Sequence, residues 1–286
     1  MMEVINMKLK EKFDELKNKN EKAFIAFYVG GDPNLDVSEK ALEVICKHAD
    51  IVEIGIPFSD PVADGLTIQK ADVRALSRGM NPIKALELAK KLNEKFPNVP
   101  KVFLTYYNII FKMGEENFVK KCKNVGISGI IVPDLPIEEA ESLLSYCEKY
   151  GVDLIFLVAP TTPDERLKKI LEKCRGFVYV VSRTGITGER EKLSEETEDL
   201  IRRVKKYSKV PVCVGFGISK KEHVEEITKF ADGAIVGSAI VKIVEKHLDE
   251  NGNIKDENKF LNDLEEFVRT LKEGTKAKKI KTQVKN

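Results

Sequence analysis

Short apolar segments recur along the chain, separated by stretches with the period of an amphipathic helix. Within each segment the apolar residues are continuous rather than alternating, as in parallel strands that are covered by helices. In the stretch 81–96 the apolar residues fall at positions 83, 86, 89 and 92, which is the spacing of one helix face. The pattern predicts eight strands, at residues 23–29, 51–57, 102–107, 129–134, 153–160, 177–182, 210–216 and 233–239.

Eight strand–helix units without a Pro- or Gly-rich linker between them predict an α/β fold, the (β/α)8 TIM barrel. A doubly wound open sheet is the alternative. The stretch MKLKEKFDELKNKN places Leu9, Phe13 and Leu16 on one face of an extra N-terminal helix, which we expect to close the bottom of the barrel. NKFLNDLEEFVRTLKEGT predicts an additional C-terminal helix. We expect a single barrel domain over residues 1–275 and a basic, disordered tail over 276–286.

The charge balance and the hydropathy of the chain exclude some classes of protein. Lys and Arg number 48 and Asp and Glu 46, so the net charge of +2 leaves no electrostatic footprint for nucleic acid. No run approaches the roughly 18 apolar residues of a membrane span, and the first residues lack the apolar stretch of a signal peptide. We expect a soluble, cytoplasmic protein. The cysteines show no CxxC spacing and are expected to be buried free thiols: Cys46, Cys122, Cys147, Cys174 and Cys213.

If the barrel forms, its chemistry belongs at the carboxyl ends of the strands and in the loops that follow them. The three histidines lie in helical segments, and no strand end carries a His/Asp/Glu cluster, so we expect no metal. Lys101 precedes the third strand, at the opposite face, and no other lysine occupies an outgoing strand end, so a Schiff base lacks its amine. Carboxylates remain, together with Arg183 and several tyrosines: the acids are Glu53, Asp64 and Asp134.

The stretch VEIGIPFSDPVADGLTIQ at residues 52–69 supplies the two strongest candidates. Glu53 lies inside an apolar strand, where desolvation should raise its pKa and suit it to give and take a proton near neutral pH. A structural Glu that is paired with a buried Arg or with backbone amides is the alternative. Asp64 lies in the turn-forming sequence ADG, so an Asx turn is an equally good explanation for it.

Glycine-rich loops after the last three strands predict an anion site. GFGIS (215–219) follows the seventh strand, and VGSAI (236–240) joins the eighth to the start of a helix. Glycines let backbone N–H groups approach an anion, and a helix N-terminus adds its dipole. SRTGITGE (182–189) follows the sixth strand and continues into a polar segment of the kind that closes over substrate. We therefore expect a phosphorylated ligand.

These segments carry a resemblance to a known family. EIGIPFSDPVADGLTIQ, together with AFIAFYVGGDP, VPDLP, APTTPDER, SRTGITG, GFGIS and GSAIVKIVE, resembles the alpha subunit of tryptophan synthase in order and spacing over nearly the whole chain. The resemblance implies a carbon–carbon lyase that cleaves indole-3-glycerol phosphate to indole and glyceraldehyde 3-phosphate by a retro-aldol reaction. It implies no cofactor and no metal in this chain, because the indole ring of the substrate serves as the electron sink.

The same resemblance implies roles for single residues. Glu53 would be the acid–base that handles the protons of the indole C3 and the glycerol hydroxyl, and Asp64 would hydrogen-bond the indole N–H and stabilise its positive charge. Core packing is the alternative for the apolar positions. The residues that match substrate-binding positions are Phe27, Leu104, Ile131, Pro133, Tyr179 and Thr187, and those that match phosphate ligands are Gly188, Gly217, Gly237 and Ser238.

The resemblance also implies a partner, the pyridoxal-phosphate β subunit of tryptophan synthase in an α2β2 complex. Pro57, Asp60 and Pro136 match loops that face this partner in the family. Two alternatives stay open. A catalytically silent barrel could only activate a partner, although Glu53 and Asp64 count against it. Another phosphate-binding barrel enzyme, such as indole-glycerol-phosphate synthase or a prenyl transferase, would want a strand-end lysine or a Mg²⁺ site.

Overall fold

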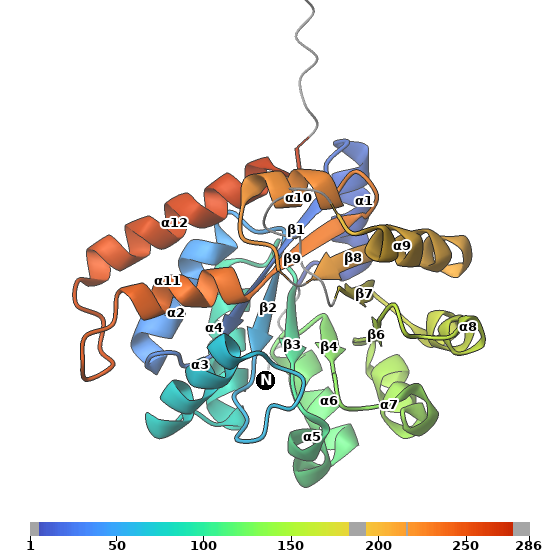
Figure 1. Cartoon of the computed structure of the whole chain (residues 1–286). Helices are drawn as coiled ribbons and strands as arrows, with labels where there is room; N and C mark the ends of the chain where they lie inside the picture. The colour runs from blue at the N-terminus through green and yellow to red at the C-terminus, as the bar shows by residue number, and fades with distance from the viewer. Residues whose placement is uncertain (1–5, 183–192, 216, 277–286) are drawn as a thin grey trace, which may run out of the picture.

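Parallel strands form a ring at the centre of the molecule, and helices cover its outside (Figure 1). The computed structural model describes residues 6–182, 193–215 and 217–276. The strands are β1 (Ala23–Val29), β2 (Ile51–Gly55), β3 (Lys101–Leu104), β4 (Gly129–Ile131), β5 (Asp153–Ile155), β6 (Leu157–Val158), β7 (Val178–Val181), β8 (Val212–Gly215) and β9 (Gly233–Val236).

The order of the strands closes the ring. Hydrogen-bonded neighbours run β5-β4-β3-β2-β1-β9-β8-β7-β6, and all the pairs are parallel. The two ends of this order, β5 and β6, are consecutive in the chain because they are the halves of the predicted strand 153–160, separated at Phe156. The Phe156 carbonyl accepts a hydrogen bond from the Tyr179 N–H at 3.0 Å, which carries the pairing across the interruption. The predicted (β/α)8 TIM barrel is confirmed, and the open doubly wound sheet is wrong.

The register of the strands stacks the interior side chains in layers. The Cα of Phe27 lies opposite that of Glu53, and the Cα of Glu53 lies opposite that of Val102. A lower layer of buried side chains contains Ile25, Ile51, Val102, Ile131, Ile155, Phe177, Cys213 and Ile235. Side chains two residues further along a strand point to the same side. The next layer, toward the carboxyl ends, is therefore built from Phe27, Glu53, Leu104, Pro133, Leu157, Tyr179, Gly215 and Gly237.

Several of the helices begin at a short polar side chain that caps them. Asn34 and Asn81 each accept a hydrogen bond at 3.0 Å from the backbone N–H three residues later, and Asp256 does the same at 2.9 Å. The helices are α1 (Leu9–Asn18), α2 (Leu35–Cys46), α3 (Leu66–Ser77), α4 (Pro82–Lys95), α5 (Tyr107–Met113), α6 (Glu115–Asn124), α7 (Glu141–Tyr150), α8 (Asp164–Lys173), α9 (Glu195–Tyr207), α10 (Lys221–Ile227), α11 (Ser238–Lys246) and α12 (Glu257–Glu273), with a 3₁₀ turn η1 (Ile137–Glu139).

The two helices predicted outside the repeat occupy different places. Leu9, Phe13 and Leu16 of α1 are buried in the same cluster as the lower layer of the barrel, so α1 closes the bottom as expected. The C-terminal helix α12 lies on the outside and packs against α2, α10 and α11 (Figure 1). The predicted limit of the domain at residue 275 and the disordered tail stay predictions.

Lys101 differs slightly from its prediction. It is the first residue of β3 rather than a residue before it, and its side chain is fully buried. Its Nζ donates to the carbonyls of Leu92 and Phe96 at 3.2 and 2.5 Å, at the end of α4. Desolvation lowers its pKa to about 8. This amine therefore completes the end of a helix at the bottom of the barrel, away from the carboxyl ends of the strands.

The composition also led to expectations about the cysteines and about membrane spans. The five cysteines are free and buried, as predicted. Within the described ranges, none of the helices is long and apolar enough to cross a membrane.

Candidate active site

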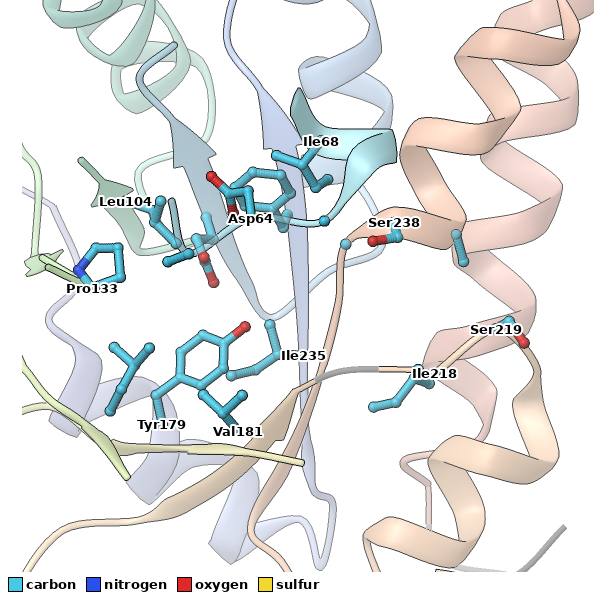
Figure 2. Close-up of a pocket in the computed structure, with 18 of the residues that line it drawn as sticks. Asp64, Ile68, Leu104, Pro133, Tyr179, Val181, Ile218, Ser219, Ile235 and Ser238 are labelled. Atoms are coloured by element: carbon cyan, nitrogen blue, oxygen red, sulfur yellow. The ribbon is translucent and has the colours of Figure 1, made fainter. Parts of the chain in front are cut away.

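A cavity of about 300 Å³ lies at the carboxyl end of the barrel interior. Figure 2 shows Leu104 and Pro133 on one side of it, Ile218, Ser219 and Ser238 on the other, and Asp64 and Tyr179 between them. One side is therefore apolar and the other is formed by glycine-containing loops. The lining residues are Phe27, Glu53, Ala63, Asp64, Gly65, Ile68, Leu104, Pro133, Leu157, Tyr179, Val181, Gly217, Ile218, Ser219, Ile235, Gly237, Ser238, Ala239 and Lys242.

Glu53 is a buried acid that faces this cavity. Strand β2 fixes it between β1 and β3, and only 1% of it is exposed. Its Oε2 atom is buried and has no hydrogen-bond partner among the described residues. Desolvation, reinforced by the charge of Asp64, raises the pKa of Glu53 to about 8. Because the predicted alternative of a structural Glu requires a partner for this carboxyl group, the geometry favours a group that is kept available for proton transfer.

Asp64 is held by Tyr106. The Tyr106 hydroxyl donates to Asp64 Oδ2 at 2.8 Å and accepts from the Ala63 N–H at 3.1 Å, so one phenol fixes both the carboxylate and its loop. The Tyr106 ring stacks on Phe58 of the same loop, with the ring centroids 5.2 Å apart. Burial raises the pKa of Asp64, and the Tyr106 hydrogen bond opposes that rise. Asp64 thus lines the cavity from a loop anchored to the strand-end Tyr106.

A second buried aspartate lies near Asp64. Asp72 is 4% exposed on the inner face of α3. Burial and the charges of Asp64 and Asp32 raise its pKa to about 8, against the effect of the Phe58 N–H. Asp32 itself forms an ion pair with Arg74, whose Nε lies 2.7 Å from Asp32 Oδ1. Asp72 is not among the described lining residues, but it titrates in the same range as Glu53 and must be controlled for in any pH experiment.

Two glycines at strand ends make room for the aromatic rings of the cavity. A Cβ on Gly55 would lie 2.8 Å from the Phe27 ring, and a Cβ on Gly215 would lie 2.6 Å from the Tyr179 hydroxyl. Side chains at these positions would displace the rings. Burial and the charges of Glu53 and Asp64 hold the pKa of Tyr179 well above its ordinary range. Tyr179 therefore stays protonated and can donate a hydrogen bond within the cavity.

The opposite end of the cavity has the features of an anion site. Gly217 has a φ of +74°, a conformation that favours glycine. Gly237 precedes Ser238, the first residue of α11, and both line the cavity. The N–H groups of a first helical turn have no partner within the helix, and the helix dipole favours an anion there. This end can hold a phosphate group.

The structure brings most of the predicted residues together. Glu53, Asp64, Phe27, Leu104, Pro133, Tyr179, Gly217, Gly237 and Ser238 all line the one cavity. Ile131 does not: it is fully buried in the lower layer at the end of β4, two residues before Pro133, and a substrate contact for it stays a prediction. Thr187 and Gly188 lie outside the described residues, as does Arg183.

Other residues of the site were missed by the sequence analysis. Tyr106 was not singled out among the tyrosines, although its position near the carboxyl end of the predicted strand 102–107 was the available signal. Lys242 lies one helical turn beyond Ser238, and this spacing could have predicted that both side chains lie on the same face of the helix. The candidate acid Asp134 has a structural role, because its Oδ1 accepts from the Tyr107 N–H at the start of α5 at 2.9 Å. In the described parts of the chain, no three His, Cys, Asp or Glu side chains are grouped to hold a metal.

A parallel (β/α)8 barrel with two carboxyl groups and two glycine-containing loops around one cavity belongs to the class of TIM barrels that bind a small ligand at the carboxyl end of their strands. Comparison with known proteins gives the family. The model of the tryptophan synthase alpha chain family matches residues 13–276. This protein is a member of the tryptophan synthase alpha chain family.

Individual relatives agree over the full length. The tryptophan synthase alpha chain of Methanocaldococcus jannaschii is 84% identical over 280 residues, which cover 98% of this chain and 99% of that one. Among solved structures, the tryptophan synthase subunit alpha of Legionella pneumophila is 28% identical with a TM-score of 0.84, covering 96% of this chain and 99% of that one. The tryptophan synthase complex of Pyrococcus furiosus contains a chain that is 37% identical with a TM-score of 0.78, covering 88% and 98%.

Proposed function

We propose that the cavity between Glu53, Asp64 and Ser238 is the site where this chain cleaves indole-3-glycerol phosphate. As a member of its family the chain is a carbon–carbon lyase, the alpha subunit of tryptophan synthase in L-tryptophan biosynthesis. The products are indole and glyceraldehyde 3-phosphate. A silent barrel that only activates a partner, or a different phosphate-binding barrel enzyme, is not favoured. The observation that carries the assignment of the site is Glu53, a buried acid with an unpaired oxygen and a pKa raised to about 8.

The two carboxyl groups have different roles in the reaction. Glu53 begins protonated and gives its proton to C3 of the indole ring, which makes that carbon tetrahedral. The Glu53 carboxylate then takes the proton of the glycerol hydroxyl as the carbon–carbon bond breaks, so one group acts as acid and then as base. Asp64 accepts a hydrogen bond from the indole N–H and stabilises the positive charge that develops there. The indole ring takes up the electrons, so we propose that the reaction in this chain needs no cofactor.

The two ends of the cavity fit the two ends of this substrate. Leu104 and Pro133 offer an apolar surface to the indole, and Ser238 on the opposite side offers a hydroxyl group to the phosphate (Figure 2). Gly217 and Gly237 also line the cavity and can offer N–H groups to the phosphate. Tyr179 remains protonated and lies between these ends, where it can donate to a glycerol hydroxyl. Thr187 and Gly188 stay predicted contacts of the substrate.

The pH profile offers a test of the role of Glu53. Since Glu53 must begin protonated, kcat/KM for indole formation should fall above pH of about 8, where this carboxyl group loses its proton. Asp72 has a pKa raised to the same value and could give a similar decline. The decline should therefore persist in Asp72→Asn. A profile that is flat to high pH, or a decline that vanishes in Asp72→Asn, would contradict the assignment.

Tyr106 is expected to matter through Asp64. Tyr106→Phe keeps the ring on Phe58 but removes the hydrogen bonds to Asp64 and to the Ala63 N–H. We expect kcat/KM to fall about tenfold, since a hydrogen bond to a charged group contributes about 1.5–3 kcal/mol and part of its loss is recovered by water. Tyr107→Phe is the matched control, because the Tyr107 hydroxyl donates to Glu115 at 2.9 Å, and neither residue lines the cavity. Equal activities of the two variants would remove Tyr106 from the site.

The partner of the chain is the tryptophan synthase β subunit. The complex structures among the relatives are of tryptophan synthase, and we propose an α2β2 assembly here. The loop after β2 and the first residue of α3 expose large apolar side chains: Val62 is 81% exposed and Leu66 75%. Exposed apolar groups gathered on a loop are suited to a protein interface. Size-exclusion chromatography with a β subunit should give the heterotetramer, and Val62→Asp should weaken it without changing the fold of the free chain.

We also propose that the chain works in the cytoplasm. Its five cysteines are buried free thiols, as is usual in a reducing compartment.

A further inference from the structure

One positively charged side chain lines the phosphate end of the cavity, and it is not among the predicted phosphate ligands. Lys242 lines the cavity together with Gly217, Gly237 and Ser238. Among the lining residues in the described part of the chain, it is the only Lys or Arg. Glu53 and Asp64 line the same cavity, so a phosphate dianion that enters it meets two acids and a set of N–H groups that carry no net charge.

The helix places Lys242 where it can reach a bound anion. Lys242 comes four residues after Ser238 in α11, so the two side chains share one face of the helix. Its neighbours Ile240, Val241, Ile243 and Val244 are buried against the barrel, whereas Lys242 is exposed. Helical side chains lean toward the N-terminus of their helix. The flexible ammonium of Lys242 can therefore extend toward the first turn of α11, where the anion would lie.

Two charged side chains near the end of α11 have partners. Glu245 Oε1 lies 3.6 Å from Arg74 Nη1, and His247 Nε2 lies 2.9 Å from Asp263 Oδ2. Lys242 makes no ion pair or hydrogen bond with the side chains that the structure describes, and the same holds for Lys246 one turn further along. Lys246 does not line the cavity. The two lysines thus differ mainly in their distance from the anion end.

We propose that Lys242 is a specificity-determining residue, which supplies the positive charge that selects a phosphorylated substrate. This inference rests on the proposed function of the cavity and deepens it. The glycine N–H groups and Ser238 fix the position of the phosphate, and the ammonium of Lys242 offsets its charge and attracts the dianion from solution. Because the phosphate stays intact in the reaction, Lys242 acts on binding and leaves the chemical step unchanged.

The test compares Lys242→Gln with Lys246→Gln, which loses the same charge on the same helix. Lys242→Gln should raise KM for indole-3-glycerol phosphate, and Ki for glycerol 3-phosphate, about tenfold, with kcat within about twofold, as for the loss of one charge-assisted contact. Added salt should weaken binding less in this variant than in the wild type, since part of the screened attraction is already gone. Lys242→Arg should recover most of the affinity. Lys246→Gln should match the wild type in KM, Ki, kcat and salt dependence.

The outcomes separate this inference from the function on which it rests. If the wild type cleaves the substrate, but Lys242→Gln and Lys246→Gln have the same KM, Ki and salt dependence, then Lys242 does not have this role. The lyase site would remain intact in that case. A large fall of kcat in Lys242→Gln with unchanged KM would also overturn it. A wild-type chain that neither binds glycerol 3-phosphate nor releases indole would overturn the proposed site, and with it this inference.

Discussion

Glu53→Gln is expected to lower kcat for indole formation by about a thousandfold or more, within the range that general acid–base groups contribute. Glutamine keeps the size of the side chain in β2 but can neither give a proton to the indole C3 nor take one from the glycerol hydroxyl. Both proton transfers are lost with one substitution. Steady-state indole release at saturating substrate measures the effect.

Binding and stability show whether this variant remains folded. Glycerol 3-phosphate should bind Glu53→Gln as it binds the wild type, because the phosphate end of the cavity is formed by other loops. Glu94→Gln, on the exposed face of α4, is a control for the loss of one carboxylate. Full activity of Glu53→Gln, or a thousandfold loss that is accompanied by loss of ligand binding, would contradict a role in proton transfer alone.

The stability of Glu53→Gln should also depend on pH in a defined direction. The pKa of Glu53 is raised from 4.5 to about 8, so the folded state prefers the neutral acid. The stability that this preference contributes is complete below pH of about 4.5 and is lost as the pH rises toward 8. Glutamine cannot ionise. The melting temperature of Glu53→Gln relative to the wild type should therefore be higher at pH 9 than at pH 5, by differential scanning fluorimetry at about these two pH values.

Asp64→Asn is expected to lower kcat by about a hundredfold to a thousandfold, the range for removing one electrostatic contact to developing charge. Asparagine can still accept the hydrogen bond of Tyr106 through its amide oxygen, so the loop should stay in place. What is lost is the negative charge that stabilises the positive indole nitrogen. Asp60→Asn is the matched control in the free chain, because Asp60 is exposed on the same loop and hydrogen-bonds Ser59 at 2.7 Å.

The same variant should shift the pH profile. The charge of Asp64 contributes to the raised pKa of Glu53, so Asp64→Asn should move the alkaline decline of the residual activity to lower pH. Asp60→Asn should leave both the rate and the profile unchanged. If Asp64→Asn retained activity within threefold of the wild type, the Asx-turn explanation of Asp64 would be the better one.

The sequence predicts the barrel well because its signal is repeated. Eight apolar segments each bury both faces, and any one of them could be misjudged without changing the fold. The interruption at Phe156 could not be predicted, because it depends on how β5 and β6 share the pairing with β4 and β7. The lengths of the strands other than β1 were overestimated for a related reason: apolar residues such as Ile56 continue past the end of the strand at Gly55.

Single residues of the site were harder to predict than the fold. Glu53 is readable because an acid in an apolar strand is unusual. Ile131 and Pro133 cannot be told apart from the sequence, since both point inward and only the height in the barrel separates packing from lining. Tyr106 was missed because its importance arises from a contact across the chain, the hydrogen bond to Asp64. Lys242 was missed because only the cavity shows that it lies at the same end as Gly217, Gly237 and Ser238.

The most direct test is indole release from indole-3-glycerol phosphate by the purified wild-type chain and by Glu53→Gln, each alone and with an added tryptophan synthase β subunit. We expect slow release by the wild-type chain alone, a strong rise with the β subunit, and no measurable release by Glu53→Gln in either condition. Release by Glu53→Gln at a rate near that of the wild type would contradict the account. So would a wild-type chain that binds glycerol 3-phosphate but releases no indole with or without the partner.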